Sequence, residues 1–182
     1  MGDAAPRADA GAVTIRRAAA LDEATVAGLA GVLVDCVEGG ASVSFMLPLS
    51  RDRAAAFWRG LAGDVAAGAR ILLLAEDATG IVGTVQLIPA PYENQPHRAD
   101  VAKMLVHRRA RRRGVGAALM RAAEDAARAA GKTVLVLDTV TGSDGARLYE
   151  SVGWQRAGDI PDYALWPQGG LCSTTFYFRR LA

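Results

Sequence analysis

The sequence predicts a mixed α/β (or α+β) fold in which a central sheet carries helices on both faces. Short apolar stretches of strand length alternate with stretches of helical spacing, in the order β-α-α-β-β-β-α-β-α-β. The stretch at residues 133–139 is almost wholly apolar, as expected of an interior strand covered on both faces. No linker or repeat divides the sequence, so we expect a disordered leader at residues 1–12 and one domain at residues 13–182.

The first part of the chain contains one predicted strand and two predicted helices. Residues 13–18 alternate apolar and polar side chains, which indicates the strand. Asp22 begins a helix with apolar residues along one face, and the glycine pair 39–40 ends it. After a loop, Ser50 begins a second helix that ends at Gly68.

The second part of the chain supplies the remaining strands and helices. The turn Asp77–Gly80 separates two apolar runs and is typical of a hairpin. The predicted segments are strands at 70–77, 81–90 and 97–107, a helix at 114–131, a strand at 133–139, a short helix that ends at Gly153, and a strand at 172–181. We expect residues 171–179 at an edge of the sheet, where an unpaired strand invites a homodimer.

Composition and motif content exclude several classes of protein. The net charge is only +2 and the excess is concentrated at Arg108–Arg113, which favours a local anion over a nucleic acid. Cys36 and Cys172 flank no metal-ligand spacing, so we expect no metal site. No apolar run approaches the ~20 residues that span a bilayer, and the start lacks a signal peptide. We therefore expect a cytoplasmic protein with no membrane partner.

The segment His107–Met120 joins a strand to a helix through an arginine-rich turn and a Gly-x-Gly sequence. A helix N-terminus has unsatisfied N–H groups that attract an anion, and the arginines add charge and donors. Glycines at 114 and 116 remove the Cβ atoms that would hold a phosphate away from these N–H groups. The dinucleotide fingerprint and the P-loop motif are both incomplete here. The segment therefore predicts a site for a compact diphosphate.

Two segments resemble motifs of the GNAT acetyltransferases. Arg111–Gly116 (R-R-R-G-V-G) matches the R/Q-x-x-G-x-G/A motif that binds acetyl-CoA. Ser143–Trp154 resembles the N-x-x-A-x-x-L-Y-x-x-x-G-F segment, with serine in place of the family's asparagine. Order and spacing agree from about Val13 to the C-terminus. The resemblance implies acetyl-CoA as cofactor and a mostly antiparallel sheet whose fourth and fifth strands splay apart.

Four further segments resemble the tabtoxin-resistance type of acetyltransferase, which acetylates a β-lactam amino-acid toxin. These segments are residues 38–46, 94–106, 137–143 and 158–171. The resemblance implies an N-acetyltransferase that acts on a small-molecule amine such as a toxin or antibiotic. Two alternatives stay open: a protein or peptide N-acetyltransferase, and a nucleic-acid-binding module that uses the arginine cluster. The cluster lacks the interleaved aromatic residues that stack on single strands.

The resemblance also implies the residues of the cofactor site. Backbone groups at the end of the fourth strand would pair with the pantetheine arm, and turn amides would hold the pyrophosphate. Arg108 or Arg109 would contact the 3′-phosphate. The cofactor site would then consist of Met104, Leu105, Val106, Arg111, Arg112, Arg113, Gly114, Val115, Gly116, Ala117 and Ser143.

Three residues are candidates for the chemistry of acetyl transfer. Tyr149 lies where the family's tyrosine faces the CoA sulfur, and a phenol with a pKa of about 10 can donate a proton to the leaving thiolate. Asp100 and Asp138 would meet at the cleft between the splayed strands, bind the acceptor ammonium and relay its proton through water. Each also has a plain structural interpretation: Tyr149 could be a core residue, Asp100 a solvated strand residue, and Asp138 the cap of the following turn. The candidates for acceptor binding are Phe45, Tyr92, Glu93 and Tyr163.

Overall fold

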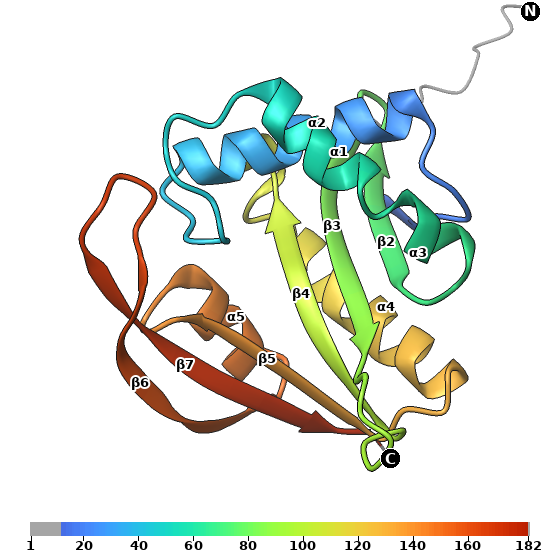
Figure 1. Cartoon of the computed structure of the whole chain (residues 1–182), viewed down its shortest axis with the longest axis vertical. Helices are drawn as coiled ribbons and strands as arrows, with labels where there is room; N and C mark the ends of the chain where they lie inside the picture. Colours follow the sequence, from blue (N-terminus) through green and yellow to red (C-terminus); the bar gives the residue numbers. More distant parts are fainter. Residues whose placement is uncertain (1–11, 182) are drawn as a thin grey trace, which may run out of the picture.

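The computed structural model describes residues 12–181, which form seven strands and five α-helices (Figure 1). The strands are β1 (Thr14–Arg17), β2 (Ile71–Asp77), β3 (Gly80–Pro89), β4 (Arg98–Val106), β5 (Val134–Val140), β6 (Gln155–Leu165) and β7 (Leu171–Arg180). The helices are α1 (Glu23–Glu38), α2 (Arg51–Arg59), α3 (Ala62–Ala66), α4 (Val115–Ala129) and α5 (Asp144–Ser151), with a 3-10 turn, η1, at Arg108–Ala110. The leader predicted at residues 1–12 lies outside the described residues except for its last position.

The strands form one sheet in the order β1-β2-β3-β4-β5-β7-β6. Every neighbouring pair is antiparallel except β4 and β5, which run parallel. The sheet is therefore mixed and mostly antiparallel, as the sequence predicts.

Helices cover both faces of this sheet, and the alternation of side chains along β2 separates the two sides. Leu72 and Leu74 pack in one buried cluster with residues of α1 and α2. Ile71 and Leu73 pack in the other, with residues of α4 and α5. Because β2 contributes to both clusters, its first five residues, 71–75, are all apolar and do not alternate with polar ones.

The C-terminal part of the sheet differs from the prediction. Strand β6 forms the edge and β7 lies between β5 and β6, so the expectation of an edge strand at residues 171–179 is wrong. Every residue of β6 is exposed or half-buried, and the strand contains Gly158 and Pro161. Proline is compatible with an edge strand, but neither residue type signals a strand in a sequence. The predicted second helix is also divided, into α2 and α3, with Gly60 and Leu61 between them.

Strands β4 and β5 stay paired over only three residues. Arg98, Ala99 and Asp100 of β4 lie opposite Val134–Val136 of β5, and beyond this point the two strands diverge (Figure 1). From Val101 onwards β4 thus has no partner strand on its β5 side within the described sheet. This divergence opens the middle of the sheet and determines where the site lies.

Candidate active site

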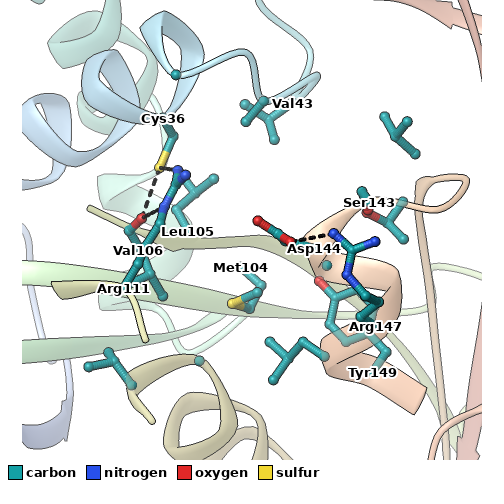
Figure 2. A pocket seen from close by; sticks show the side chains of 18 of the residues that line it. Cys36, Val43, Met104, Leu105, Val106, Arg111, Ser143, Asp144, Arg147 and Tyr149 are labelled. Atoms are coloured by element: carbon teal, nitrogen blue, oxygen red, sulfur yellow. Dashed lines mark hydrogen bonds and ion pairs between the residues drawn. The ribbon is translucent and has the colours of Figure 1, made fainter. Parts of the chain in front are cut away.

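The first cavity lies where β4 and β5 diverge and has a volume of about 660 Å³. Its walls include the ends of β4 and β5, the N-terminal turns of α4 and α5, and the loop after α1 (Figure 2). Ten of the eleven predicted cofactor residues line it: Met104, Leu105, Val106, Arg111, Arg112, Gly114, Val115, Gly116, Ala117 and Ser143. The exception is Arg113, whose guanidinium lies 4.0 Å from the carboxylate of Asp77.

Helix α4 begins at this cavity without a side-chain cap. Among the described helices of eight residues or more, α1, α2 and α5 are capped by Asp22, Ser50 and Ser143, whereas Gly114 precedes α4 and caps nothing. The N–H groups of the first turn of α4 therefore have no intrahelical acceptor and line a cavity large enough for a ligand. This arrangement fits the phosphates of a nucleotide cofactor.

The two glycines of the turn, Gly114 and Gly116, are constrained for different structural reasons. Gly114 has φ +77°, a left-handed conformation that glycine adopts without steric penalty. Gly116 has no such φ, but a Cβ added there would lie 2.9 Å from Cδ2 of Leu148 on α5. A side chain at Gly116 would therefore displace the end of Leu148, so this glycine also serves the close approach of α4 to α5, a constraint that we did not predict for it.

The arginines of the turn divide into two groups. Arg108 pairs with Asp35 at 2.9 Å and Arg109 pairs with Asp77 at 2.6 Å. Neither lines the cavity, so the prediction that one of them meets the 3′-phosphate has no geometric support. Arg111 does line it, and its Nε donates to the carbonyl of Val106 at 3.1 Å.

Sequence reasoning overlooked a further cation of this cavity, Arg147 on α5. It lines the cavity and pairs with Asp144 at 2.5 Å (Figure 2). Arg147 occupies a variable position of the Ser143–Trp154 segment, so the motif does not indicate a function for it. The cavity thus has three arginines in its wall, two from the turn and one from α5.

Tyr149 occupies the bottom of the cavity. Its ring is buried between Trp154 and Tyr177, with centroids 6.1 and 6.0 Å away, and its hydroxyl is directed into the cavity (Figure 2). Burial, and to a smaller extent the charge of Asp138, raise the pKa of Tyr149 above its ordinary value. The phenol therefore keeps its proton at neutral pH and can act as a donor.

A second cavity of about 510 Å³ adjoins the first. The two share part of their walls, and the shared residues are Ser42, Val43, Met104, Thr139, Val140 and Tyr149. The second cavity extends from Tyr149 toward β6 and β7 and toward the loop between α1 and α2. Two ligands that occupied the two cavities would meet beside Tyr149.

Asp138 lies in the wall of the second cavity and Asp100 does not. One oxygen of Asp138, Oδ2, accepts a hydrogen bond from Thr174 at 2.9 Å, and the other accepts none from a described side chain. Asp100 is still paired with Val136 on β5, below the point where the strands diverge, and its carboxylate accepts from Arg98 at 2.6 Å. The expectation that both carboxylates meet in the cleft is therefore wrong for Asp100.

The four predicted acceptor residues also divide. Phe45 and Tyr163 line the second cavity, from the α1–α2 loop and from β6. Tyr92 and Glu93 lie in the exposed loop that precedes β4, at the end of the sheet where β4 and β5 are still paired (Figure 1). They line neither cavity, because the loop lies at the opposite end of β4 from Met104.

Lys103 is the residue of the second cavity that sequence reasoning missed. Lys103 and Met104 together lie opposite a single residue of β3, Val85, so β4 contains a bulge, and Lys103 has φ +49°. Its ammonium donates to Oγ of Ser44 at 3.1 Å. A bulge has no reliable sequence signature here, and a lysine in a strand is usually solvated.

Comparisons with known proteins agree with this geometry. Residues 68–156 match the family model of an acetyltransferase (GNAT) domain. One similar structure is that of the yncA protein of Salmonella typhimurium, which is provisionally assigned as an acetyltransferase and was solved with its cofactor acetyl-CoA. It is 20% identical to this chain, and 94% of this chain and 95% of that one align with a TM-score of 0.76. A ribosomal-protein-alanine N-acetyltransferase from Brucella melitensis is 22% identical, with coverages of 92% and 99% and a TM-score of 0.75. A GCN5-related N-acetyltransferase from Kribbella flavida is 23% identical, with coverages of 93% and 98% and a TM-score of 0.74.

The match to the family model thus identifies an acetyltransferase, and the fold agrees with it. Residues 68–156, which contain the arginine–glycine turn and α4, are the part of the chain that matches the GNAT acetyltransferase domain model. The chain is an N-acetyltransferase, and acetyl-CoA is its acetyl donor. Within residues 12–181, no helix could cross a membrane and no group of three or more His, Cys, Asp or Glu could hold a metal ion.

Proposed function

We propose that the protein acetylates the amino group of a small, amino-acid-like molecule, as an enzyme that inactivates a toxin or antibiotic would. The acceptor would occupy the second cavity, beside Asp138, and the cofactor would occupy the first. The resemblance of four segments to the tabtoxin-resistance type of acetyltransferase supports this acceptor class. The shape of the second cavity supports it independently.

The observation that carries the proposal is a bridge across the acceptor side of the site. Oγ of Ser42 donates to the carbonyl of Leu165 at 2.7 Å, and the backbone N–H of Leu47 donates to the carbonyl of Pro167 at 2.8 Å. These bonds join the α1–α2 loop to the end of β6 and to the turn that follows it. A through-going groove for an extended peptide would have to pass this bridge. A cavity of about 510 Å³ instead suits a compact molecule.

The residues around Tyr149 can perform the proton transfers that this reaction needs. Acetyl-CoA, when bound, supplies an acetyl group activated as a thioester. Asp138 presents an unpaired carboxylate oxygen that can hold the acceptor ammonium and pass its proton to water. Tyr149 presents a protonated phenol at the junction of the cavities, where the thiolate would leave. Amides of the α4 turn and the cations Arg111, Arg112 and Arg147 would hold the phosphates.

The nucleic-acid alternative loses support from the same arginines. Arg108 and Arg109 are paired with Asp35 and Asp77, and two further arginines, Arg111 and Arg112, line the first cavity. A polyanion needs many simultaneous contacts along its backbone. The paired arrangement therefore favours a local phosphate ligand.

A screen of acceptors tests the proposed function. Acetyl-CoA would be offered with free amino acids, β-lactam amino acids, aminoglycosides and decapeptides, thiol release would be recorded, and products would be identified by mass spectrometry. We expect transfer to a small amine and none to the decapeptides. Faster transfer to peptide N-termini or to peptide lysines would overturn the acceptor class, and no transfer to any amine would overturn the function.

A further inference from the structure

The second cavity contains a cation as well as the carboxylate of Asp138. We propose that Lys103 is the anion-binding residue of this cavity, so that the acceptor is a zwitterion with its ammonium at Asp138 and a carboxylate or similar anion at Lys103. This inference rests on the proposed function and adds to it the charge pattern of the acceptor. It also assigns a specificity-determining role to one side chain.

The bulge in β4 places Lys103 at the cavity. In an uninterrupted strand Val101, Lys103 and Leu105 would share one face. Val101 instead packs in the cluster of α4, while Leu105 packs in the cluster of α1 and α2, on the other face. The extra residue thus reverses the alternation between these two positions and turns Lys103 away from the α4 core.

The ammonium of Lys103 has few interaction partners at the second cavity. It donates to Ser44 at 3.1 Å and lies 5.7 Å from the centre of the Phe57 ring. No carboxylate of the described residues comes within 4.0 Å of it, and the side chain is only partly exposed. A cation withdrawn from water is stabilised by an anion, and the described protein supplies none in contact.

The two charges of the cavity are near each other but not paired. Asp138 acts electrostatically on Lys103, and Arg70 opposes it, yet no contact joins Lys103 to Asp138. Burial is the main cause that lowers the pKa of Lys103. Asp138 keeps one oxygen without a hydrogen bond from a described side chain, while Thr174 holds the other. A ligand that carried an ammonium and a carboxylate would satisfy both groups at once.

The test compares matched acceptors with and without the anion. L-Methionine and L-methioninamide, and two similar pairs from the acceptor screen, would be assayed with wild type and with Lys103→Met. Amidation also changes the basicity of the amine, so the quantity to compare is the change in the ratio of kcat/KM between carboxylate and amide. We expect this ratio to fall by about 10-fold or more in Lys103→Met, because hydrogen bonds to a charged group are the strong ones. The KM for acetyl-CoA should stay unchanged.

The sequence offers a matched control, because it contains only one other lysine. Lys132 donates to the carbonyl of Pro96 at 2.7 Å and lines neither cavity, so Lys132→Met should leave the ratio unchanged. Lys103→Arg should retain part of the preference for the carboxylate.

A binding measurement accompanies the kinetics. With two lysines in the chain, the side-chain resonance of Lys103 can be assigned by comparison with Lys132→Met. We expect it to shift when L-methionine is added to the enzyme with CoA, and not when L-methioninamide is added.

The outcomes separate this inference from the proposed function. If wild type acetylates small amines but Lys103→Met leaves the ratio unchanged, the enzyme is as proposed and Lys103 only covers Phe57. If wild type prefers amides or uncharged amines throughout, the zwitterion assignment is wrong as well. If no small amine is acetylated at all, the proposed function fails and this inference fails with it.

Discussion

At the scale of single residues, we expect the chemistry to depend on Tyr149, the one titratable side chain that lines both described cavities. Its ring is held by aromatic neighbours, and its hydroxyl faces the space between the ligands. Tyr149→Phe keeps the ring and removes only the hydroxyl. We expect kcat to fall about 10²–10⁴-fold, the usual contribution of a positioned proton donor, while the KM for acetyl-CoA stays the same.

A neighbouring tyrosine provides the control for this substitution. Tyr177 is buried against Tyr149, and its hydroxyl donates to Glu150 at 2.8 Å, away from both cavities. Tyr177→Phe should lower stability slightly and leave kcat near that of wild type. If Tyr149→Phe kept nearly full kcat while the chemical step limited the rate, Tyr149 would be a packing residue and not the proton donor.

The pH dependence of kcat follows from the raised pKa of Tyr149. A donor works in its protonated form, and a raised pKa extends that form to higher pH. An ordinary phenol would lose its proton at about pH 10. We therefore expect kcat at saturating substrates to show no alkaline decline up to about pH 10. A decline well below that value, absent from Tyr149→Phe, would show that the phenol ionises too easily for this role.

At the scale of elements, we expect cofactor binding to depend on how α4 begins. The helix starts from a left-handed glycine, has no cap and packs closely on α5. Gly114→Ala would strain the turn, which costs roughly 1–2 kcal/mol, without creating a clash, since a Cβ there meets nothing within 4 Å. We expect lower stability and a smaller increase in melting temperature on adding CoA.

The same substitution at another glycine should have the opposite effect. Gly63 lies in α3, has no positive φ, and a Cβ there also meets nothing within 4 Å. Gly63→Ala should stabilise the protein by about 0.4–1 kcal/mol and leave the CoA-induced shift unchanged. Denaturant unfolding and thermal melts of both variants check the pair. Equal effects at the two positions would mean that the conformation of Gly114 does not determine the site.

The elements also show which predictions a sequence supports. The α4 turn was predictable because its arginines, glycines and helical pattern are adjacent in the chain, and ten of the eleven predicted cofactor residues line the first cavity. Strand β6 was not predictable, because an exposed edge strand that contains Gly158 and Pro161 shows no alternation of apolar and polar residues. The position of Lys103 at the second cavity was not predictable either, because the bulge in β4 depends on its pairing with β3, which only the folded sheet defines.

At the scale of the whole molecule, the divergence of β4 and β5 divides the site into two adjoining cavities. One contains the start of α4 and the arginines, and the other contains Asp138 and Lys103. The sequence predicted that the strands diverge, through the family resemblance, but not the residue at which they do so. Pairing continues as far as Asp100, and that single register decides that Asp138 reaches the site and Asp100 does not.

We propose that the acceptor binds at Asp138 while the cofactor binds separately in the first cavity. Asp138→Asn tests this division of the site, with Asp100→Asn as the matched variant. Acceptor kinetics and calorimetry of CoA binding would be measured for both. We predict that Asp138→Asn lowers kcat/KM for the acceptor by at least about 10²-fold with CoA affinity unchanged, and that Asp100→Asn changes neither. Unchanged acceptor kinetics in Asp138→Asn, or a loss as large in Asp100→Asn, would contradict the account.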